Sequence, residues 1–321
     1  MLRSREAIIG EDQGALPLPQ SIVGLCVAKN ESDIIEAMVR HNLCYLDALH
    51  VVDNDSADST PDILDALATE FPGRLTWASD PRSGHVQTDI VNTTLAPLAH
   101  STDACQIVLL DADEFLRGDR QLFTETLRNS ATPILLPWVT FVPTPDDDKS
   151  VPNPIARITH RRARESPQLC KTTVPRALIG QVTISAGNHK LKGPGAKPAS
   201  VIEGLSLGHF PVRSKEQLTS KILIGAWSLR MRRRKGREGY HWLLLSERIR
   251  ASEELTDSDL LTVALGYSGR AQLDFVREPL PLVAPPALKY TPTHNKNLWR
   301  NLVAFTERCV QLLEHKPANL S

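Results

Sequence analysis

Short apolar runs alternate with helical patterns along the first third of this sequence. The apolar runs cover 21–28, 48–52, 75–78 and 107–110, and apolar residues recur at helical spacing in the segments between them. Continuous apolar runs of this length are typical of strands that are buried on both faces of a parallel sheet. Strands that alternate with helices indicate βαβ units. The sequence therefore predicts an α/β fold, with a Rossmann-like, mostly parallel sheet flanked by helices.

The predicted organisation has three parts. Residues 1–20 are expected to form a tail, 21–212 one α/β domain, and 213–321 a mainly helical C-terminal extension. Proline at Pro61 favours a helix start at Thr60, because proline suits the first helical position. Helices are also expected over 87–98, 120–128 and 297–315, with a strand over 133–141 and an extended, proline-rich segment over 280–292.

Composition restricts the function and the compartment. Lys+Arg and Asp+Glu are both 37, so the overall charge selects neither nucleic acid nor a membrane. The five cysteines include no Cys-x-x-Cys pair, which suits a reducing compartment. No signal-peptide core is visible, and no window approaches the roughly 20 apolar residues that span a bilayer. We expect a soluble, cytoplasmic protein, with any membrane contact peripheral.

An acidic cluster follows the apolar run 107–110. Ligands of open α/β sheets bind beyond the carboxyl ends of the strands. Asp111 and Asp113, one residue apart at such an end, could together meet one hard cation, either Mg²⁺ or Mn²⁺. The alternative is an acidic helix cap without a metal. If Asp113 is a solvent-accessible ligand, its replacement by alanine should change stability by no more than roughly 1 kcal/mol.

Acidic side chains follow two other predicted strands. Glu31, Asp53 and Asp55 could accept hydrogen bonds from ribose hydroxyls and a base edge. Glu31 could instead be a helix N-terminal carboxylate, and Asp53 could close an Asx-turn. Asn92 and Asp89 could face a nucleotide or merely form polar surface, and Arg82 could meet phosphate or remain solvated.

The order of these segments resembles glycosyltransferase family 2 and its bacterial relatives with the GT-A fold. Three segments carry the resemblance: Val27–Glu31 at the first strand end, Val51–Ser56 in place of V-D-D-G-S, and Asp111-Ala112-Asp113 as the D-x-D motif. Gly187-Asn188-His189 and His209–Ser214 also resemble segments of the subgroup that carries D-A-D-E-F. The match covers about 21–230, and Asn54-Asp55 departs from the commoner D-G.

The resemblance implies an inverting, metal-dependent hexosyltransferase of polysaccharide biosynthesis. The donor would be a nucleotide-diphospho-sugar, with UDP favoured, and the acceptor an unknown glycan or lipid-linked molecule. The implied metal ligands are Asp111, Asp113 and His209. The predicted nucleotide-sugar contacts are Ala28, Asn30, Glu31, Asp53, Asp55, Arg82, Asn92, Asp111 and Arg213.

Two features near the end of this match support the same site from the residues alone. His209 follows a short apolar, strand-like run, and Arg213 adds a second cationic group for phosphate. If His209 binds a metal, proton competition should weaken that binding below a pH of roughly 6.5. The alternative is a structural histidine at a strand end.

The acid-base partner stays open among several residues. An inverting transferase needs a carboxylate or imidazole to accept the proton of the acceptor hydroxyl. The candidates are His189, Glu165, Glu203 and the Asp146-Asp147-Asp148 run, and the last of these suits a solvated loop.

Two basic clusters lie outside these motifs. They are His160–Arg164 and Arg230–Arg237. The second could hold an anionic acceptor or contact the inner face of a membrane. The alternative is a solvated helix end.

Three other functions compete with the transferase. A catalytically silent nucleotide-sugar-binding module is the main alternative, although both aspartates of the D-x-D motif are present. A D-x-D phosphatase would carry its nucleophile at the first strand. A nucleotidylyltransferase would need a glycine-rich loop where Lys29-Asn30-Glu31 stands.

Overall fold

The structure is a computed structural model that describes residues 20–82, 86–196, 198–231, 240–251, 254–267, 274–292 and 297–314. The first part alternates strands and helices in the order β1 (Ser21–Ala28), α1 (Ile35–Asn42), β2 (Ala48–Asp53), α2 (Thr60–Glu70), β3 (Leu75–Ser79), α3 (Gln87–Thr102) and β4 (Ala104–Asp111). The predicted βαβ alternation is confirmed, and each strand starts at its predicted residue or within three residues of it.

The later segments add short strands and then helices. The strands are β5 (Glu114–Arg117), β6 (Ile134–Val142), β7 (His160–Arg162), β8 (Cys170–Pro175), β9 (Thr183–Ile184), β10 (Leu191–Lys192), β11 (Ser200–Val201), β12 (Ser206–His209) and β13 (Phe275–Arg277). The helices are α4 (Arg120–Asn129), α5 (Pro154–Arg157), α6 (Lys215–Met231), α7 (Tyr240–Arg250), α8 (Asp257–Gly266) and α9 (Asn297–Glu314).

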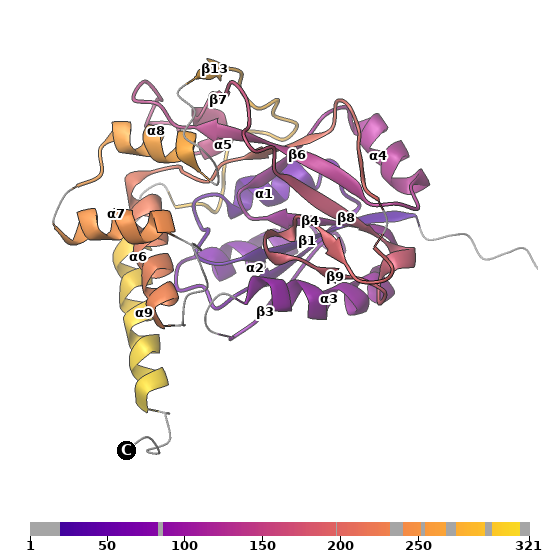
Figure 1. The fold of residues 1–321 in the computed structure, drawn as a ribbon, viewed down its shortest axis with the longest axis horizontal. Coiled ribbons are helices and arrows are strands. Elements are labelled where there is room, and N and C mark those ends of the chain that lie inside the picture. Colours follow the sequence, from indigo (N-terminus) through magenta and orange to yellow (C-terminus); the bar gives the residue numbers. More distant parts are fainter. Residues whose placement is uncertain are drawn as a thin grey trace, which may run out of the picture.

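One curled sheet organises the molecule. Its main path is β13-β7-β6-β8-β4-β1-β2-β3, and the block β4-β1-β2-β3 is parallel. The strands β8, β6, β7 and β13 continue the sheet through antiparallel pairs. Figure 1 shows helices flanking the sheet, with α6, α7, α8 and α9 gathered at one end of it. The predicted Rossmann-like α/β fold is confirmed.

Alternating side chains of the central strands form two separate cores. On one face, Cys26 and Leu110 pack with apolar residues of α1, α2 and α4. On the other face, Leu25 and Leu109 pack with apolar residues of α3. Both faces of β1 and β4 are therefore buried, which explains why these strands read as continuous apolar runs in the sequence.

A tight turn after β4 brings a distant part of the chain to the acidic cluster. Ala112 and Asp113 separate β4 from β5, which pairs with β12 so that Glu114 lies opposite His209. The turn at Gly118 depends on glycine, because its φ is +126° and a Cβ there would collide with the carbonyl oxygen of Gly204. This close approach seats β12 against β5.

Contacts cross the predicted domain boundary at 212/213. The strand β13 pairs with β7, so part of the C-terminal region joins the sheet. The buried carboxylate of Glu36 on α1 accepts backbone N–H groups of Lys289, Tyr290 and Thr291 at 2.8 Å each. The segment 280–292 forms neither helix nor strand and bends at several residues.

Two predicted features lie outside what the structure describes. Most of the tail 1–20 is one, and the basic run Arg230–Arg237 is the other, since the side chain of Arg230 and residues 232–239 are not described. Within the described ranges, no helix combines the length and the apolar character that crossing a bilayer requires.

Candidate active site

The carboxyl ends of three neighbouring strands place four predicted residues at one edge of the sheet. In the register of the sheet, Ala28 lies opposite Asp53, and Val27 lies opposite Asp111. Glu31 follows β1 by three residues, and Asp113 follows β4 by two. This is the edge at which open α/β sheets bind ligands.

Asp111 is held by two side chains that the sequence analysis did not single out. Its carboxylate accepts from Lys171 Nζ at 2.6 Å and from Gln87 Nε2 at 2.7 Å. The Lys171 side chain is 1 % exposed, and its Nζ also lies 3.5 Å from Glu114. Burial lowers the pKa of Lys171, but Asp111 and Glu114 outweigh burial and raise it, so the lysine is charged.

Glu114 fixes the geometry of the turn from within. One carboxylate oxygen accepts the backbone N–H of Asp111 at 2.8 Å, and the other accepts Trp138 Nε1–H at 2.6 Å. Burial raises the pKa of Glu114 to about 8, against the opposing effect of Lys171. Through its two hydrogen bonds, Glu114 positions the backbone of Asp111 away from solvent.

Asp113 lies among three nitrogen-bearing side chains. Its carboxylate is 3.3 Å from Lys221 Nζ, 3.8 Å from His209 Nε2 and 3.8 Å from Arg213 Nη1. Burial opposes ionisation of Asp113, but Lys221, His209 and Arg213 hold its pKa well below its usual range. Asp113 is therefore an anion at neutral pH, with 5 % of the residue exposed.

The burial of Asp113 corrects one expectation drawn from the sequence. A solvent-accessible ligand could be removed with little loss of stability, but Asp113 is buried and its carboxylate pairs with Lys221 at 3.3 Å. Removing one partner of a buried ion pair is strongly destabilising. Replacement of Asp113 is therefore expected to lower stability as well as to remove a ligand.

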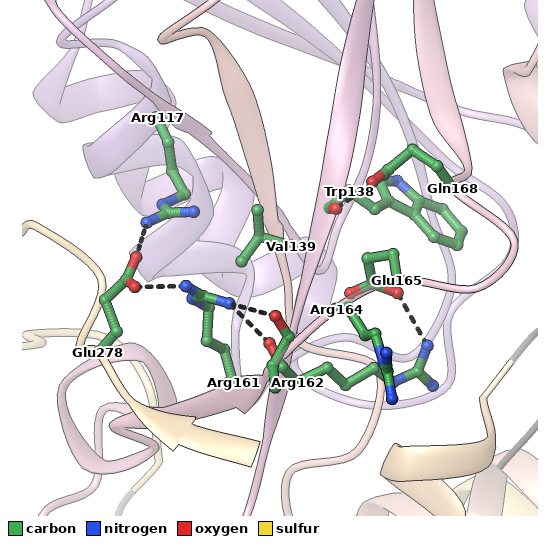
Figure 2. A pocket seen from close by; sticks show the side chains of 10 residues that line it. Arg117, Trp138, Val139, Arg161, Arg162, Arg164, Glu165, Gln168 and Glu278 are labelled. Atoms are coloured by element: carbon green, nitrogen blue, oxygen red, sulfur yellow. Dashed lines mark hydrogen bonds and ion pairs between the residues drawn. The ribbon is translucent and has the colours of Figure 1, made fainter. Parts of the chain in front are cut away.

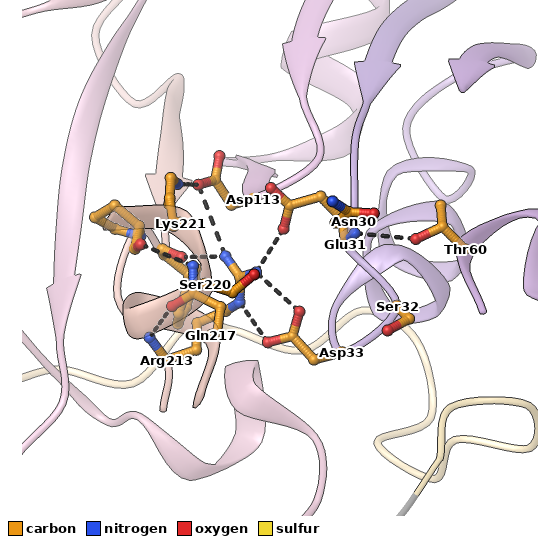
Figure 3. A network of polar contacts seen from close by, with 12 residues as sticks. Asn30, Glu31, Ser32, Asp33, Thr60, Asp113, Arg213, Gln217, Ser220 and Lys221 are labelled. Carbon is orange, nitrogen blue, oxygen red and sulfur yellow. Dashed lines mark hydrogen bonds and ion pairs between the residues drawn. The ribbon is translucent and has the colours of Figure 1, made fainter. Parts of the chain in front are cut away.

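Arg213 connects the C-terminal half of the chain to the edge of the sheet (Figure 3). Its side chain is fully buried, and it donates to Glu31, to both oxygens of Asp33 and to the carbonyl of Phe210. Burial lowers the pKa of Arg213 but Asp33 and Glu31 raise it, so it stays charged. The structure thus places Arg213 as a clamp on protein carboxylates, whereas the sequence predicted a phosphate contact.

The surroundings of Glu31 favour the protonated, neutral form of its side chain. Burial raises its pKa to about 7, although Arg213 and Lys221 oppose the rise. Its backbone carbonyl also accepts from Ile34 and Ile35 at the start of α1. The carboxylate of Glu31 is therefore engaged by Arg213, and only its backbone carbonyl contacts the start of α1.

His209 is neutral and lacks a partner for one ring nitrogen. Its ring stacks on Trp138 with centroids 4.0 Å apart, and Nε2 faces Asp113. Its Nδ1 is buried without a hydrogen-bond partner. Burial lowers the pKa of His209 to about 3, despite the opposing effect of Asp113.

The loop after β2 keeps one carboxylate oxygen unused. Asp53 accepts the backbone N–H of Ser56 through Oδ2 at 3.1 Å, whereas its buried Oδ1 has no partner. Burial raises the pKa of Asp53. Asn30 accepts the N–H of Ala57 at 2.8 Å, so it orders this loop, and Asp55 is exposed with φ 57°.

Two predicted nucleotide contacts are engaged elsewhere. Asn92 uses its amide to hold Ile184 of β9, accepting its N–H at 2.7 Å, and it donates to Thr88 at 2.7 Å. Arg82 forms a surface pair with Asp80 at 2.6 Å. In the described part of the chain, neither side chain forms a hydrogen bond or ion pair with Asp111 or Asp113.

Asp147 and Asp148 close local turns with Thr144 and Ser150, and the other three acid-base candidates differ in their surroundings. Glu203 is exposed and precedes β12, at the opposite end of this strand from His209, so the structure does not bring it to Asp113. Glu165 pairs with Arg162 at 2.9 Å and accepts the N–H of Thr140 at 2.6 Å. His189 packs edge-on against Trp138 and faces the carbonyl of Cys170 through Nδ1 at 2.8 Å.

The predicted metal ligands fit a site that protein and substrate would share better than a site made of protein side chains alone. Among the described residues, no group of three or more His, Cys, Asp or Glu side chains is placed to hold a metal. Both oxygens of Asp111 are engaged by Gln87 and Lys171, which leaves Asp113 and His209. Mg²⁺ is commonly bound by one or two carboxylates together with water and substrate phosphates. The residues present fit that arrangement.

Several site residues lacked a clear signal in the sequence. Lys171 is the one charged residue of the otherwise uncharged strand CKTTVP, and Lys221 lies on α6 next to the buried residues Leu218 and Ile222. A charge within an apolar pattern is a usable signal, because buried charges need partners. The partners themselves lie 60 and 108 residues away in sequence, which no local pattern shows.

The comparisons with known proteins add little. The sequence matches no protein-family model and no curated protein. A crystal structure of S. aureus TarS 1–349 is similar at 12 % identity, with 79 % of this chain and 76 % of that chain covered and a TM-score of 0.37. A mycobacterial protein is similar at 13 % identity, with 60 % and 65 % covered and a TM-score of 0.32. At these TM-scores, neither likeness carries an argument about this chain.

We expect His209 to remain neutral throughout the physiological range. Because its pKa is lowered to about 3, its ring should stay unprotonated down to about pH 4. This replaces the sequence expectation of a change near pH 6.5. NMR titration of the histidine rings from about pH 5 to about pH 8, assigned by comparison with His209→Gln, measures it. A His209 inflection near pH 6.5 would show that the ring is solvated.

Proposed function

We propose that this protein is a glycosyltransferase that moves a sugar from a nucleotide-diphospho-sugar, with UDP favoured, to a glycan or lipid-linked acceptor. The observation that carries the proposal is the meeting of Asp53, Asp111 and Asp113 at one edge of the sheet. An unpartnered carboxylate oxygen of Asp53 and the pair formed by Asp113 and His209 lie at this edge. The motif order that resembles family 2 supports the same function.

Each residue of the edge has a distinct role in this proposal. Asp53 would accept a hydrogen bond from a hydroxyl of the nucleotide through its unused oxygen. Glu31, which is held by Arg213, would lie beside the nucleotide. Asp113 and His209 would hold Mn²⁺ or Mg²⁺, and Asp111 would be kept in place by Lys171. When bound, the cation would neutralise the charge of the diphosphate.

The side chains around Asp113 also supply permanent positive charge. Lys221 is 25 % exposed, and Asp111 is 27 % exposed, so the edge reaches solvent at these two residues. Burial lowers the pKa of Lys221, but Tyr267 and Asp113 raise it, which keeps it a cation. Lys221 is therefore placed to attract an anionic leaving group.

His189 is the best supported acid-base residue of the three candidates. Its Nδ1 faces a backbone carbonyl and therefore carries the proton, which leaves a lone pair on Nε2. Burial lowers its pKa, so the imidazole is neutral at pH 7 and can accept a proton from an acceptor hydroxyl. Glu165 is tied to Arg162, and Glu203 lies at the far end of β12.

The replacement Asp113→Asn tests the metal and nucleotide site. We expect calorimetry to show that Mn²⁺ strengthens UDP binding to the wild type and no longer does so in the variant. Stability should fall by about 2–4 kcal/mol, because Lys221 loses its anionic partner, whereas Arg213 keeps Glu31 and Asp33. The exposed Asp146→Asn is the matched control and should change neither quantity. Equal Mn²⁺ dependence in wild type and Asp113→Asn would refute the metal role.

The replacement His189→Gln tests catalysis separately from binding. Loss of a general base typically lowers the rate by about 10²–10⁴-fold. We expect hydrolysis of UDP-sugars by the purified protein to fall by this factor while the affinity for UDP stays within about twofold. Wild-type protein that binds UDP but neither transfers nor hydrolyses any UDP-sugar would instead favour the catalytically silent binding module.

A further inference from the structure

A second polar site shares Trp138 with the surroundings of the candidate active site. A cavity of about 240 Å³ is lined by Arg117, Trp138, Arg161, Arg162, Arg164 and Glu278, among others. Figure 2 shows the guanidinium groups of Arg117, from β5, and Arg161, from β7, both turned toward Glu278. The cluster His160–Arg164 was singled out in the sequence, and the proposed transfer reaction leaves it without a role.

The charges around this cavity do not balance. Four arginines line it, together with two glutamates. Arg162 is buried and donates to Glu165 at 2.9 Å and to the carbonyls of Ala264 and Tyr267. The two remaining inner arginines, Arg117 and Arg161, share the single carboxylate of Glu278, at 2.9 Å and 2.6 Å.

These two arginines also have unused hydrogen-bonding capacity. The Nε atoms of Arg117 and Arg161 are buried without a hydrogen-bond partner. Their side chains are only 14 % and 23 % exposed, so solvent screens their charge weakly. Hydrogen bonds from Arg161 lower the pKa of Glu278, which is therefore ionised and occupies the position that an external anion would take.

We infer that this cavity binds a phosphate group of the acceptor. Arginine forks match the geometry of phosphate oxygens, and a dianion would balance two cations that now share one carboxylate. Glu278, whose side chain is 44 % exposed, can turn to solvent when the anion enters. The inference rests on the proposed function only in naming the ligand as part of the acceptor.

Trp138 links this cavity to the candidate active site. Trp138 is among the residues that line the cavity, its ring stacks on His209, and its Nε1–H donates to Glu114. A phosphate in the cavity would therefore lie one side chain away from the group that faces Asp113. This arrangement suits an acceptor whose phosphate is anchored while a nearby hydroxyl reaches the donor sugar.

The test is a titration of the full chain with inorganic phosphate, without nucleotide or metal and at constant ionic strength. The shift of the Trp138 indole N–H in NMR spectra reports binding. We expect Arg161→Gln to weaken phosphate binding by at least about tenfold. Glu278→Gln should strengthen it several-fold, because the competing carboxylate is gone. The matched control Arg128→Gln removes another arginine that pairs with a carboxylate but lies on α4, outside the cavity lining, and should have no effect.

The opposite signs of the two variants keep the inference testable even if one of them is unstable. No saturable shift of Trp138 in the wild type, or equal affinity in wild type, Arg161→Gln and Glu278→Gln, would overturn it. Displacement of phosphate by UDP, with Arg161→Gln behaving as wild type, would place the phosphate in the nucleotide site and also overturn it. Because neither nucleotide nor metal is needed, failure of the proposed function leaves this result readable.

Two further arms identify the source of the phosphate. One repeats the titration with glycerol 3-phosphate, and the other measures co-sedimentation with phosphatidylglycerol vesicles against phosphatidylcholine vesicles. Vesicle binding that Arg161→Gln weakens assigns the cavity to a lipid headgroup. Glycerol phosphate binding without vesicle binding assigns it to a soluble phosphorylated acceptor.

Discussion

The buried guanidinium of Arg213 is the constraint on which the candidate site depends. It joins the link between β12 and α6 to the start of α1, through Glu31 and Asp33, and it lies 3.8 Å from Asp113. A buried arginine without carboxylate partners would cost several kcal/mol, so these elements must meet in this arrangement. The consequence is that His209 and Lys221, far from the D-x-D motif in sequence, are held against Asp113.

The charges at this edge explain both the pKa values and the way in which a metal could bind. Asp113 faces Lys221 and Arg213 and has a lowered pKa, whereas burial dominates at Glu114 and Glu31 and raises theirs. A divalent cation would have to compete with charges already present around Asp113. It would therefore bind best together with a diphosphate, whose negative charge offsets the positive charges of Lys221 and Arg213.

The alternation of apolar runs and helical patterns in the sequence predicts the fold well. The strand β1 coincides with its predicted bounds, and the register of the sheet brings Asp53 and Asp111, two predicted site residues, to one edge. The roles of Arg213 and Asn92 were not predictable, because the carboxylates and backbone groups that engage them are long-range partners. The pairing of the C-terminal strand β13 with the sheet was not predictable either, because its three exposed residues carry no burial pattern.

The most direct measurement of the central claim is paramagnetic broadening by Mn²⁺ in the presence of UDP. If nucleotide and cation meet at Asp113 and His209, the indole N–H of Trp138, which stacks on His209, should broaden strongly. The indole of Trp77, on β3 at the far side of the parallel block, should broaden much less, and Mg²⁺ should broaden neither. Equal broadening of both indoles, or no broadening of Trp138 when UDP is present, would contradict the account.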